Sequence, residues 1–213
     1  MVTVVAIDGT FSSGKGTLAK QLAKHYQLPH LDTGKLYRAV AKIIQDQGAD
    51  PDDSEACTQA AQNITADMLD EPVLKSGGIG AIASRVAVHK SVRAALLDYQ
   101  RDFAANGGVL DGRDIGTVIC PEADVKLYID AEPEERARRR HAELTGYGED
   151  ISIETVFEQL KERDHRDANR TEAPLKIASD AHLIDTTGLS IERAFAAAVK
   201  IIDAVLEAKA SKK

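Results

Sequence analysis

The residues with the clearest chemical potential lie near the start of the chain, in the segment IDGTFSSGKGT from Ile7 to Thr17. It combines three glycines and one lysine directly after an apolar, β-branched run. Glycines let backbone N–H groups surround an anion with no Cβ in the way, and a following helix adds positive charge through its N-terminus. A lysine there contributes a mobile point charge. The segment therefore predicts binding of phosphate groups.

The spacing Gly9-x₄-Gly14-Lys15 matches the P-loop. In that arrangement Lys15 reaches the β- and γ-phosphates, and the hydroxyl of Thr17 serves Mg²⁺ directly or through water. Gly16 departs from the general pattern, in which Ser or Thr follows the lysine. A plain strand-to-helix turn is the alternative, but spacing, lysine and flanking elements all agree with the P-loop. The predicted ATP-binding residues are Gly9, Thr10, Phe11, Ser12, Ser13, Gly14, Lys15, Gly16 and Thr17.

Arginines gather in two later segments, ERARRR from Glu135 to Arg140 and ERDHRDANR from Glu162 to Arg170. Such clusters suit small polyanions such as nucleotides. A solvated helix face with Arg–carboxylate pairs explains them equally well from composition alone. The Asn/Thr-Lys-x-Asp stretch with which GTPases read their base does not occur in the sequence.

The elements that must position these residues alternate between apolar runs and segments of helical spacing. The expected strands lie in VTVVAI, LPHLDTG, GGVLDG, DVKLYIDA and AHLIDTT. Helical periodicity follows each of them, with Pro133 and Ser190 as start signals for the last helices. Between Ile64 and Ile82 no period is clear, and loop or short strand pairs are expected. This alternation predicts an α/β fold with a mainly parallel sheet.

The composition limits the classes of function. The 213 residues carry a net charge of −7, with 43% hydrophobic and 29% charged residues, as in a soluble globular protein of one domain. The acidic balance argues against a nucleic acid polymer as partner. Cys57 and Cys120 form neither a metal spacing nor a disulfide framework, which fits the cytoplasm. We expect no signal peptide and no membrane span.

Longer motifs carry a family resemblance over most of the chain. GTFSSGKGT resembles the P-loop of nucleoside monophosphate kinases. LDTGKLYRA, VLDGRDIGTVICPEADVKLYIDA, PEERARRR, ERDHRDANRTEAPL and DTTGLSIE together resemble bacterial cytidylate kinases, in that family's order. The most specific of these are DGRDIGTV and the RDxxRxxAPL-like stretch.

This resemblance implies transfer of the γ-phosphoryl group of MgATP to CMP or dCMP. It also implies a three-layer P-loop kinase fold with a five-stranded parallel sheet. Residues 1–213 would form one domain, with a short acceptor-binding insert at about 60–90 and an arginine-bearing lid at about 136–170. The partners would be ATP, CMP and dCMP, with Mg²⁺ as cofactor, and the protein would be a monomer.

The resemblance also assigns residues to the acceptor and to the transferring group. Arg38, Arg113 and Arg170 would hold the CMP phosphate, and Arg163 and Asp167 would lie at its ribose. Arg136 and Arg140 would act from the lid helix. Lys15, Arg113, Arg136, Arg140 and Arg163 are the expected catalytic residues.

Base recognition is assigned to Asp114, Arg93 and Ser84. A carboxylate accepts from the cytosine amino group, whereas uracil presents an oxygen there, and a mismatch of this kind discriminates strongly. Ser84 and Arg93 would otherwise lie on a solvated helix. Thr33 and Tyr37 complete the expected acceptor site, although Tyr37 also suits the core.

Two further acids follow strands. Asp111 resembles a Walker-B acid that orients Mg²⁺ through water, with a turn cap as the alternative. Asp32 suits a helix cap, together with Thr33, or a supporting role better than that of a base. No histidine falls in a matching motif, and an ionised phosphate acceptor needs no general base.

The insert departs from the family pattern. The stretch from Ile64 to Ser84 is short, and SGGIGAIAS stands where the family carries an arginine. Discrimination between CMP and UMP could therefore be relaxed. The alternatives to a cytidylate kinase are a related small-acceptor kinase with relaxed preference between CMP and UMP, and a P-loop nucleotide switch.

Overall fold

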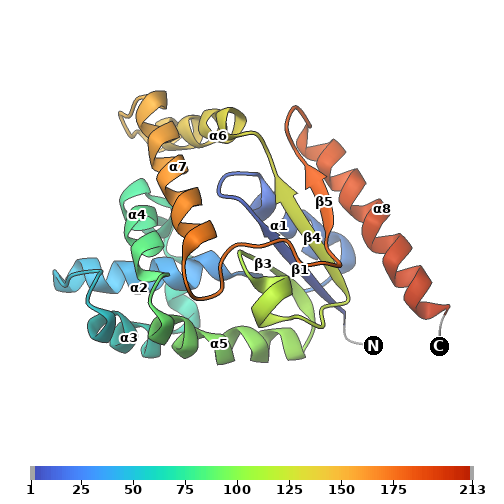
Figure 1. The fold of residues 1–213 in the computed structure, drawn as a ribbon, viewed down its shortest axis with the longest axis horizontal. Coiled ribbons are helices and arrows are strands. Elements are labelled where there is room, and N and C mark those ends of the chain that lie inside the picture. Colours follow the sequence, from blue (N-terminus) through green and yellow to red (C-terminus); the bar gives the residue numbers. More distant parts are fainter. Residues whose placement is uncertain (1–2, 212–213) are drawn as a thin grey trace.

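The centre of the molecule is a five-stranded parallel sheet. The computed structural model describes residues 3–211, so Val2 of the first expected strand lies outside them. The strands are β1 (Val4–Gly9), β2 (His30–Asp32), β3 (Gly108–Gly112), β4 (Val125–Asp130) and β5 (His182–Asp185). Their order is β2-β3-β1-β4-β5, with every pair parallel (Figure 1). The predicted α/β fold with five parallel strands is confirmed.

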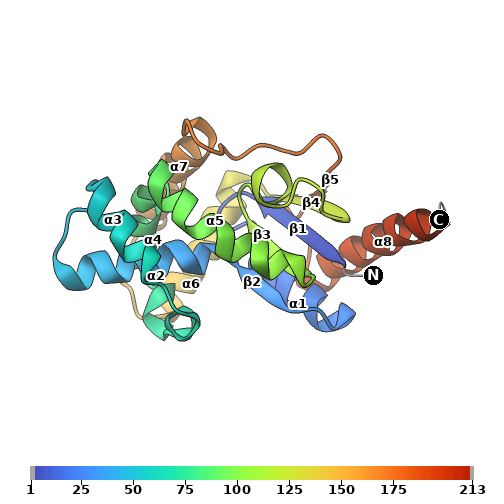
Figure 2. The same cartoon turned by 90° about the horizontal axis from the view of Figure 1, so that it is seen from below.

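Helices cover both faces of this sheet, giving three layers. The helices are α1 (Lys15–Tyr26), α2 (Thr33–Gln47), α3 (Ser54–Gln62), α4 (Gly77–Val86), α5 (Lys90–Ala105), α6 (Pro133–Gly146), α7 (Ile153–Asn169) and α8 (Ile191–Ala210). Short helical turns are η1 (Ala66–Asp70), η2 (Pro72–Lys75) and η3 (Ile115–Ile119). On one face, α1 and α8 pack on Ile7, Leu127 and Ile129. On the other, α5 and η3 pack on Ala6 and Leu110 (Figure 2).

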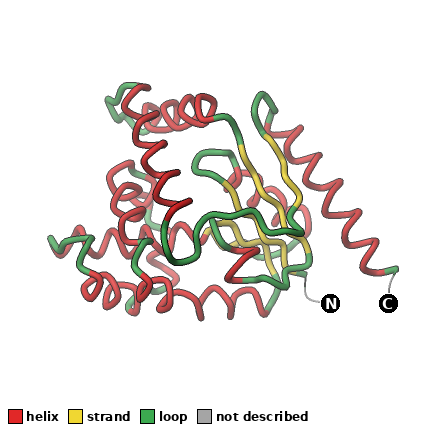
Figure 3. The backbone as a smooth tube through the Cα atoms, viewed as in Figure 1, coloured by secondary structure: helices red, strands yellow, loops and turns green. Residues whose placement is uncertain are grey.

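A second cluster of helices lies beside the sheet. It is built from α2, α3 and α5, which bury Val40, Ile44 and Leu96 against one another, and α4 adds Ile79 and Ala83. Figure 3 shows helices and turns, with no strand, in this part of the described chain.

The expectation of loop or strand pairs between Ile64 and Ile82 is therefore wrong. The segment forms η1, η2 and the first half of α4. Ser76 begins α4, with its hydroxyl accepting from the Ile79 N–H at 3.4 Å. The Gly77 N–H donates to a carboxylate oxygen of Glu149 at 2.9 Å. Burial of Leu74 and Ile79 stabilises a helix that its glycines disfavour.

The carboxyl ends of β1 and β3 meet at one edge of the sheet. Ile7 pairs with Asp111 and Asp8 with Gly112, so the loops that follow the two strands lie side by side. The hairpin of α6 and α7 stands over this edge (Figure 1). In open parallel sheets ligands bind in the crevice at such an edge.

Among residues 3–211, none of the helices combines the length and the apolar character needed to cross a bilayer.

Candidate active site

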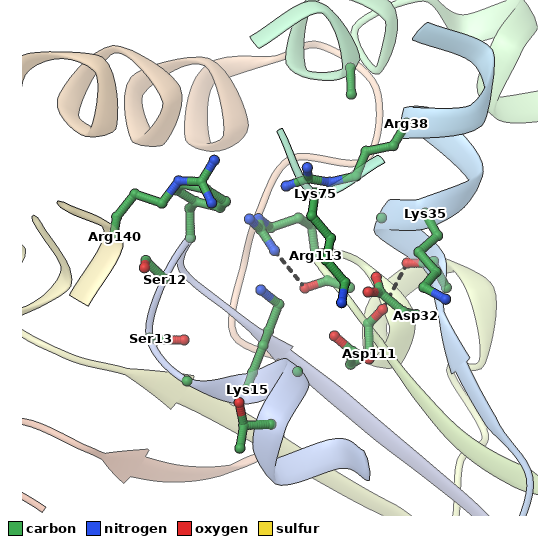
Figure 4. Close-up of a pocket in the computed structure, with 18 of the residues that line it drawn as sticks. Ser12, Ser13, Lys15, Asp32, Lys35, Arg38, Lys75, Asp111, Arg113 and Arg140 are labelled. Carbon is green, nitrogen blue, oxygen red and sulfur yellow. Dashed lines mark hydrogen bonds between the residues drawn. The ribbon is translucent and has the colours of Figure 1, made fainter. Parts of the chain in front are cut away.

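A cleft of about 940 Å³ opens at this edge of the sheet. Its walls come from the P-loop, the start of α2, the insert, the segment after β3, and the helices α6 and α7. In Figure 4, Lys15 points from the P-loop into the cleft, with Arg113, Arg38 and Lys75 facing it and Asp32 and Asp111 beside it. Nearly all the residues predicted from the sequence converge on this single space.

The P-loop is shaped by positions that accept no ordinary side chain. Gly9 has φ +154°, and a Cβ there would collide with the carbonyl oxygen of Ile129 on the neighbouring strand. Gly14, directly before α1, has φ +91°. Within the loop, the Ser13 hydroxyl donates to the carbonyl oxygen of Thr10 at 3.0 Å. The loop thus curls tightly around a space that an anion can fill.

Lys15 is a buried cation aimed into that space. Its Nζ donates to the Thr10 carbonyl oxygen at 3.4 Å. Burial, and then the positive charge of Arg113, lower the pKa of Lys15 to about 7, against the opposing effects of Asp111 and Asp32. Because burial destabilises the charged ammonium group, a phosphate that binds beside it stabilises the protonated form strongly.

Asp111 and Asp32 lie next to each other on the far side of Lys15. One carboxylate oxygen of Asp111 is 2.6 Å from Nε2 of His30, and the Thr33 hydroxyl donates to the Asp111 backbone carbonyl at 2.9 Å. Burial and the charge of Asp111 raise the pKa of Asp32. Asp32 is the residue before α2, but its side chain makes no capping hydrogen bond; capping by Asp32 is therefore not confirmed, and its side chain lines the cleft instead.

These acids, with Thr17, fit a hard divalent cation. Carboxylate and hydroxyl oxygens are the protein ligands that Mg²⁺ accepts, alongside waters and substrate phosphates. A cation beside two buried carboxylates stabilises their charged forms. Asp111 also faces the P-loop, since a Cβ on Gly16 would lie 3.7 Å from its Oδ2.

Opposite the P-loop, Arg38, Arg113 and Arg163, from three separate segments, form a fan beside Asp167. Arg113 Nε donates to Asp167 Oδ2 at 2.8 Å, and Arg163 Nε lies 4.0 Å from the same oxygen. Arg38 donates to the carbonyl oxygen of Leu74. Burial lowers the pKa of Arg163 to about 9, helped by the charges of Arg113, Arg38 and Arg140 and opposed by Asp167. The fan therefore holds more positive charge than Asp167 balances.

A second group of ion pairs in this wall surrounds Asp114. Its carboxylate pairs with Arg93 and, at 3.5 Å, with Nη2 of Arg170. The Arg93 guanidinium also stacks 5.5 Å from the centre of the Tyr37 ring. Ser84 lies near by, and its hydroxyl accepts from Arg166 Nε at 3.2 Å. The arrangement offers both hydrogen-bond acceptors and donors to a flat polar ring.

Asp8 connects the two sides of the cleft from below. Its carboxylate, 4% exposed, accepts from the N–H groups of Ile115 at 2.7 Å and Gly116 at 2.8 Å. Burial raises its pKa to about 6, although both hydrogen bonds oppose the rise. Asp8 thus ties the end of β1 to the segment that carries Arg113 and Asp114.

The structure does not bring every predicted residue to the cleft surface. Gly9 and Thr10 support the loop from behind, and the Thr10 hydroxyl donates to Asp130 at 2.7 Å. Arg136 is turned inward and 3% exposed, with Nη1 2.7 Å from Asp164 and 3.3 Å from the carbonyl oxygen of Phe11. The cleft-lining residues of α6 are Glu135, Arg139, Arg140 and Glu143.

Arg139 is the clearest residue that the sequence interpretation missed. Its Nη1 donates to the Ser13 carbonyl oxygen at 3.3 Å and its Nη2 to that of Thr186 at 2.8 Å. It lies on α6 between the predicted Arg136 and Arg140, and nothing in its residue type distinguishes it from them. Lys75, on η2, also lines the cleft, and no motif in the sequence indicated it.

Where the resemblance led us to expect an arginine, the insert has the glycine-rich helix α4. Gly80 lies against Arg38, and a Cβ added there would lie 3.4 Å from both of its terminal nitrogens. The helix backbone thus approaches the guanidinium of Arg38 closely, and the carbonyl oxygen of Gly80 also accepts from Arg163 at 3.5 Å.

Comparisons with known proteins agree with this geometry. Residues 5–204 match the family model described as cytidylate kinase. A protein named cytidylate kinase from Brucella suis is 52% identical over 205 residues, which cover 95% of this chain and 94% of the relative. A protein of the same name from Xanthobacter autotrophicus is 54% identical over 203 residues, covering 94% and 97%.

A solved structure supports the fold alone. An uncharacterized protein from Eubacterium ventriosum superposes with a TM-score of 0.53 at 15% identity, covering 94% of this chain and 98% of its own. Fold, motifs and family match all agree with the resemblance found in the sequence, and the chain belongs to the cytidylate kinase family.

Proposed function

We propose that this chain transfers the γ-phosphoryl group of MgATP to CMP or dCMP, giving CDP or dCDP and ADP, within the cleft between the P-loop and the arginine fan. The observation that supports this most directly is that Lys15, Arg38, Arg113 and Arg163 line one cleft, in which Figure 4 shows Lys15 facing Arg38 and Arg113. Phosphoryl transfer depends on positioning and charge neutralisation rather than on covalent catalysis. When two nucleotides meet end to end, the phosphates of each need positive groups, and the two walls of the cleft supply them.

The donor phosphates are assigned to the P-loop. Backbone N–H groups from Gly14 to Thr17 and the N-terminus of α1 would surround the β-phosphate. Lys15 would stabilise the negative charge that develops on the β–γ bridging oxygen during transfer. Arg139 and Arg140 line the same end of the cleft from α6 and would approach the γ-phosphate. Because Arg136 is turned inward, we assign it the task of holding the lid to the loop.

Mg²⁺ is the metal that we propose, held by Thr17 and Asp111 through water. When bound, it would neutralise charge on the β- and γ-phosphates. Asp32 would support it from the neighbouring strand end.

The acceptor is assigned to the opposite wall. Arg38, Arg113 and Arg170 would grip the CMP phosphate with the paired N–H geometry that guanidinium groups offer. Asp167 would accept from the ribose hydroxyls, with Arg163 beside it. The attacking phosphate oxygen is already ionised, so no side chain has to remove a proton from it.

The base is assigned to the pocket around Asp114. Asp114 would accept from the cytosine amino group, and Arg93 would donate to the ring acceptors N3 or O2. Tyr37, Thr33 and Ser84 would complete the pocket. Uracil would place an oxygen against the Asp114 carboxylate, an unpaired contact that disfavours UMP.

The organisation of the whole chain is part of the proposal. Residues 1–213 act as one domain and one monomer in the cytoplasm, with residues 60–90 enclosing the acceptor and residues 136–170 closing as a lid. Closure would exclude water that otherwise competes for the γ-phosphoryl group.

A coupled ADP-release assay with CMP, dCMP and UMP tests the proposal. We expect CMP and dCMP to stimulate ADP release and UMP to do so weakly; comparable kcat/KM for UMP would instead favour the relaxed kinase. In the same assay Arg170→Ala should raise the KM for CMP about 10- to 100-fold, as expected when a buried charged contact is lost. Arg85→Ala, whose arginine pairs with Asp52 on the outer surface, is the matched control.

The rival nucleotide switch makes the opposite prediction. It would hydrolyse ATP slowly, with no stimulation by any monophosphate. That result would reject the proposed reaction.

A further inference from the structure

Phe11 is the residue of the P-loop on which the lid converges. Its ring lies 3.9 Å from the guanidinium carbon of Arg163 and 5.4 Å from that of Arg140. Its backbone carbonyl oxygen accepts from Arg136 at 3.3 Å. Three arginines, two from α6 and one from α7, therefore contact one residue of the donor loop.

Arg163 has little other support. Its side chain is 18% exposed, and its buried Nε has no hydrogen-bond partner in the part of the chain that the structure describes. Asp167 stands 4.0 Å away and is already engaged by Arg113 at 2.8 Å. Within residues 3–211, the side chain of Arg163 makes one hydrogen bond, to the carbonyl oxygen of Gly80, and it is long at 3.5 Å. The face of the Phe11 ring is thus the main surface against which this guanidinium rests.

We infer that Phe11 is a positioning residue: its ring holds the guanidinium of Arg163 at the junction of the two nucleotide sites and thereby couples the P-loop to the lid. A cation stacked on an aromatic face is stabilised by the ring quadrupole, and more strongly when it is removed from water, as here. The ring needs no hydrogen bond from Arg163, so it leaves the donors of that guanidinium available to the substrates. The inference rests on the proposed role of Arg163 at the acceptor.

Substitution of the ring tests this inference. Phe11→Leu keeps an apolar side chain but removes the aromatic face, and Phe11→Tyr keeps the face. We expect Phe11→Leu to lower kcat/KM for CMP about tenfold, the scale of a desolvated cation–π contact. The KM for ATP should change less than twofold, and Phe11→Tyr should be at least five times more active than Phe11→Leu.

The chain offers a matched control on the outside of the lid. Lys161 stacks on Phe157 at 4.9 Å, a second cation–π pair on α7. Phe157→Leu should leave the kinetic constants within twofold of the parent. If Phe11→Leu instead raised the KM for ATP and spared kcat/KM for CMP, the ring would serve the donor loop only and the inference would be overturned.

A double-mutant cycle separates this inference from the proposed function. In an Arg163→Met background, Phe11→Leu should lower kcat/KM for CMP by less than twofold, because the group it positions is absent. Additive losses, with Arg163→Met itself impaired, would overturn the inference alone. An unimpaired Arg163→Met would overturn both the inference and the acceptor role of Arg163.

The contact also has a signature that is independent of activity. In the NMR spectrum of the free protein, the side-chain protons of Arg163 should shift upfield through the ring current of Phe11. The shift should vanish in Phe11→Leu and persist in Phe11→Tyr. Its absence from the parent spectrum would contradict the stacking and overturn the inference.

Discussion

The two walls of the cleft are built in opposite ways. The donor wall is one continuous segment, Gly9 to Thr17, to whose backbone we assign most of the phosphate binding and whose shape depends on glycine at defined positions. The acceptor wall is assembled from side chains of α2, α4, α5, α7 and the end of β3, held by ion pairs around Asp114 and Asp167. A backbone site tolerates little change in shape, whereas a side-chain site can be adjusted one contact at a time.

The largest expected effect is on the donor wall. Lys15→Met should lower kcat about 10²- to 10³-fold, because Lys15 is the P-loop's own cation at the transferring group and such a contact strengthens in the transition state. Steady-state kinetics at saturating ATP and CMP measures it, with Lys161→Met as the exposed control. A change confined to the KM for ATP would show that Lys15 only binds, and the contrast between the walls would weaken.

On the acceptor wall, Asp114→Asn should change selectivity more than rate. The amide of the variant can donate a hydrogen bond to the uracil oxygen that the carboxylate would repel. The ratio of kcat/KM for CMP over UMP should therefore fall about 10- to 100-fold. Asp180→Asn, whose carboxylate pairs with Lys126 outside the cleft, is the control. An unchanged ratio with lowered rates would place base recognition elsewhere.

Asp8, which joins the two walls, should make the stability of the protein depend on pH. The pKa of Asp8 is about 6 in the folded protein against 3.8 for an unperturbed carboxyl, so between these values the folded state binds more protons than the unfolded state. Stability should therefore decrease as pH rises from 4 to 6, by roughly 3 kcal/mol from this group. Urea unfolding at several pH values should show this component in the parent and lose it in Asp8→Asn. An equal slope in both proteins would contradict it.

The smallest expected effect is the number of protons taken up when ATP binds. With a pKa of about 7, Lys15 is mostly neutral at pH 8 in the free protein, and phosphates should raise that pKa on binding. Binding of ATP at pH 8 should therefore take up a fraction of one proton. Calorimetry in two buffers of different ionisation enthalpy measures it, and zero uptake or proton release would contradict the assignment.

The strands and most helices could be predicted from the sequence because their patterns are local. Apolar runs followed by helical periodicity identify β1 and β4, and glycine spacing identifies the P-loop. The helix α4 was missed because Gly77, Gly78 and Gly80 weaken its propensity. Its stability comes from Ile79 and Ala83 in a buried cluster with Leu74, which no local pattern reveals.

The same limit applies to the site. The predicted acceptor residues converge on the cleft, but the ion pairs that fix them join residues up to 56 positions apart. The orientation of Arg136 and Arg139 depends on where α6 meets the P-loop, so residue type alone could not say which of them faces the nucleotides. Asp8 was not identified because its partners are backbone N–H groups of a distant segment.

The surplus of buried cations has a practical consequence for handling this enzyme. Burial, together with repulsion from neighbouring arginines, holds the pKa values of Lys15 and Arg163 well below their usual range. Any small oxyanion that enters the cleft relieves that repulsion and stabilises the fold by mass action. Preparations in sulfate or phosphate buffers should therefore melt at higher temperature and turn over more slowly than the same protein in chloride.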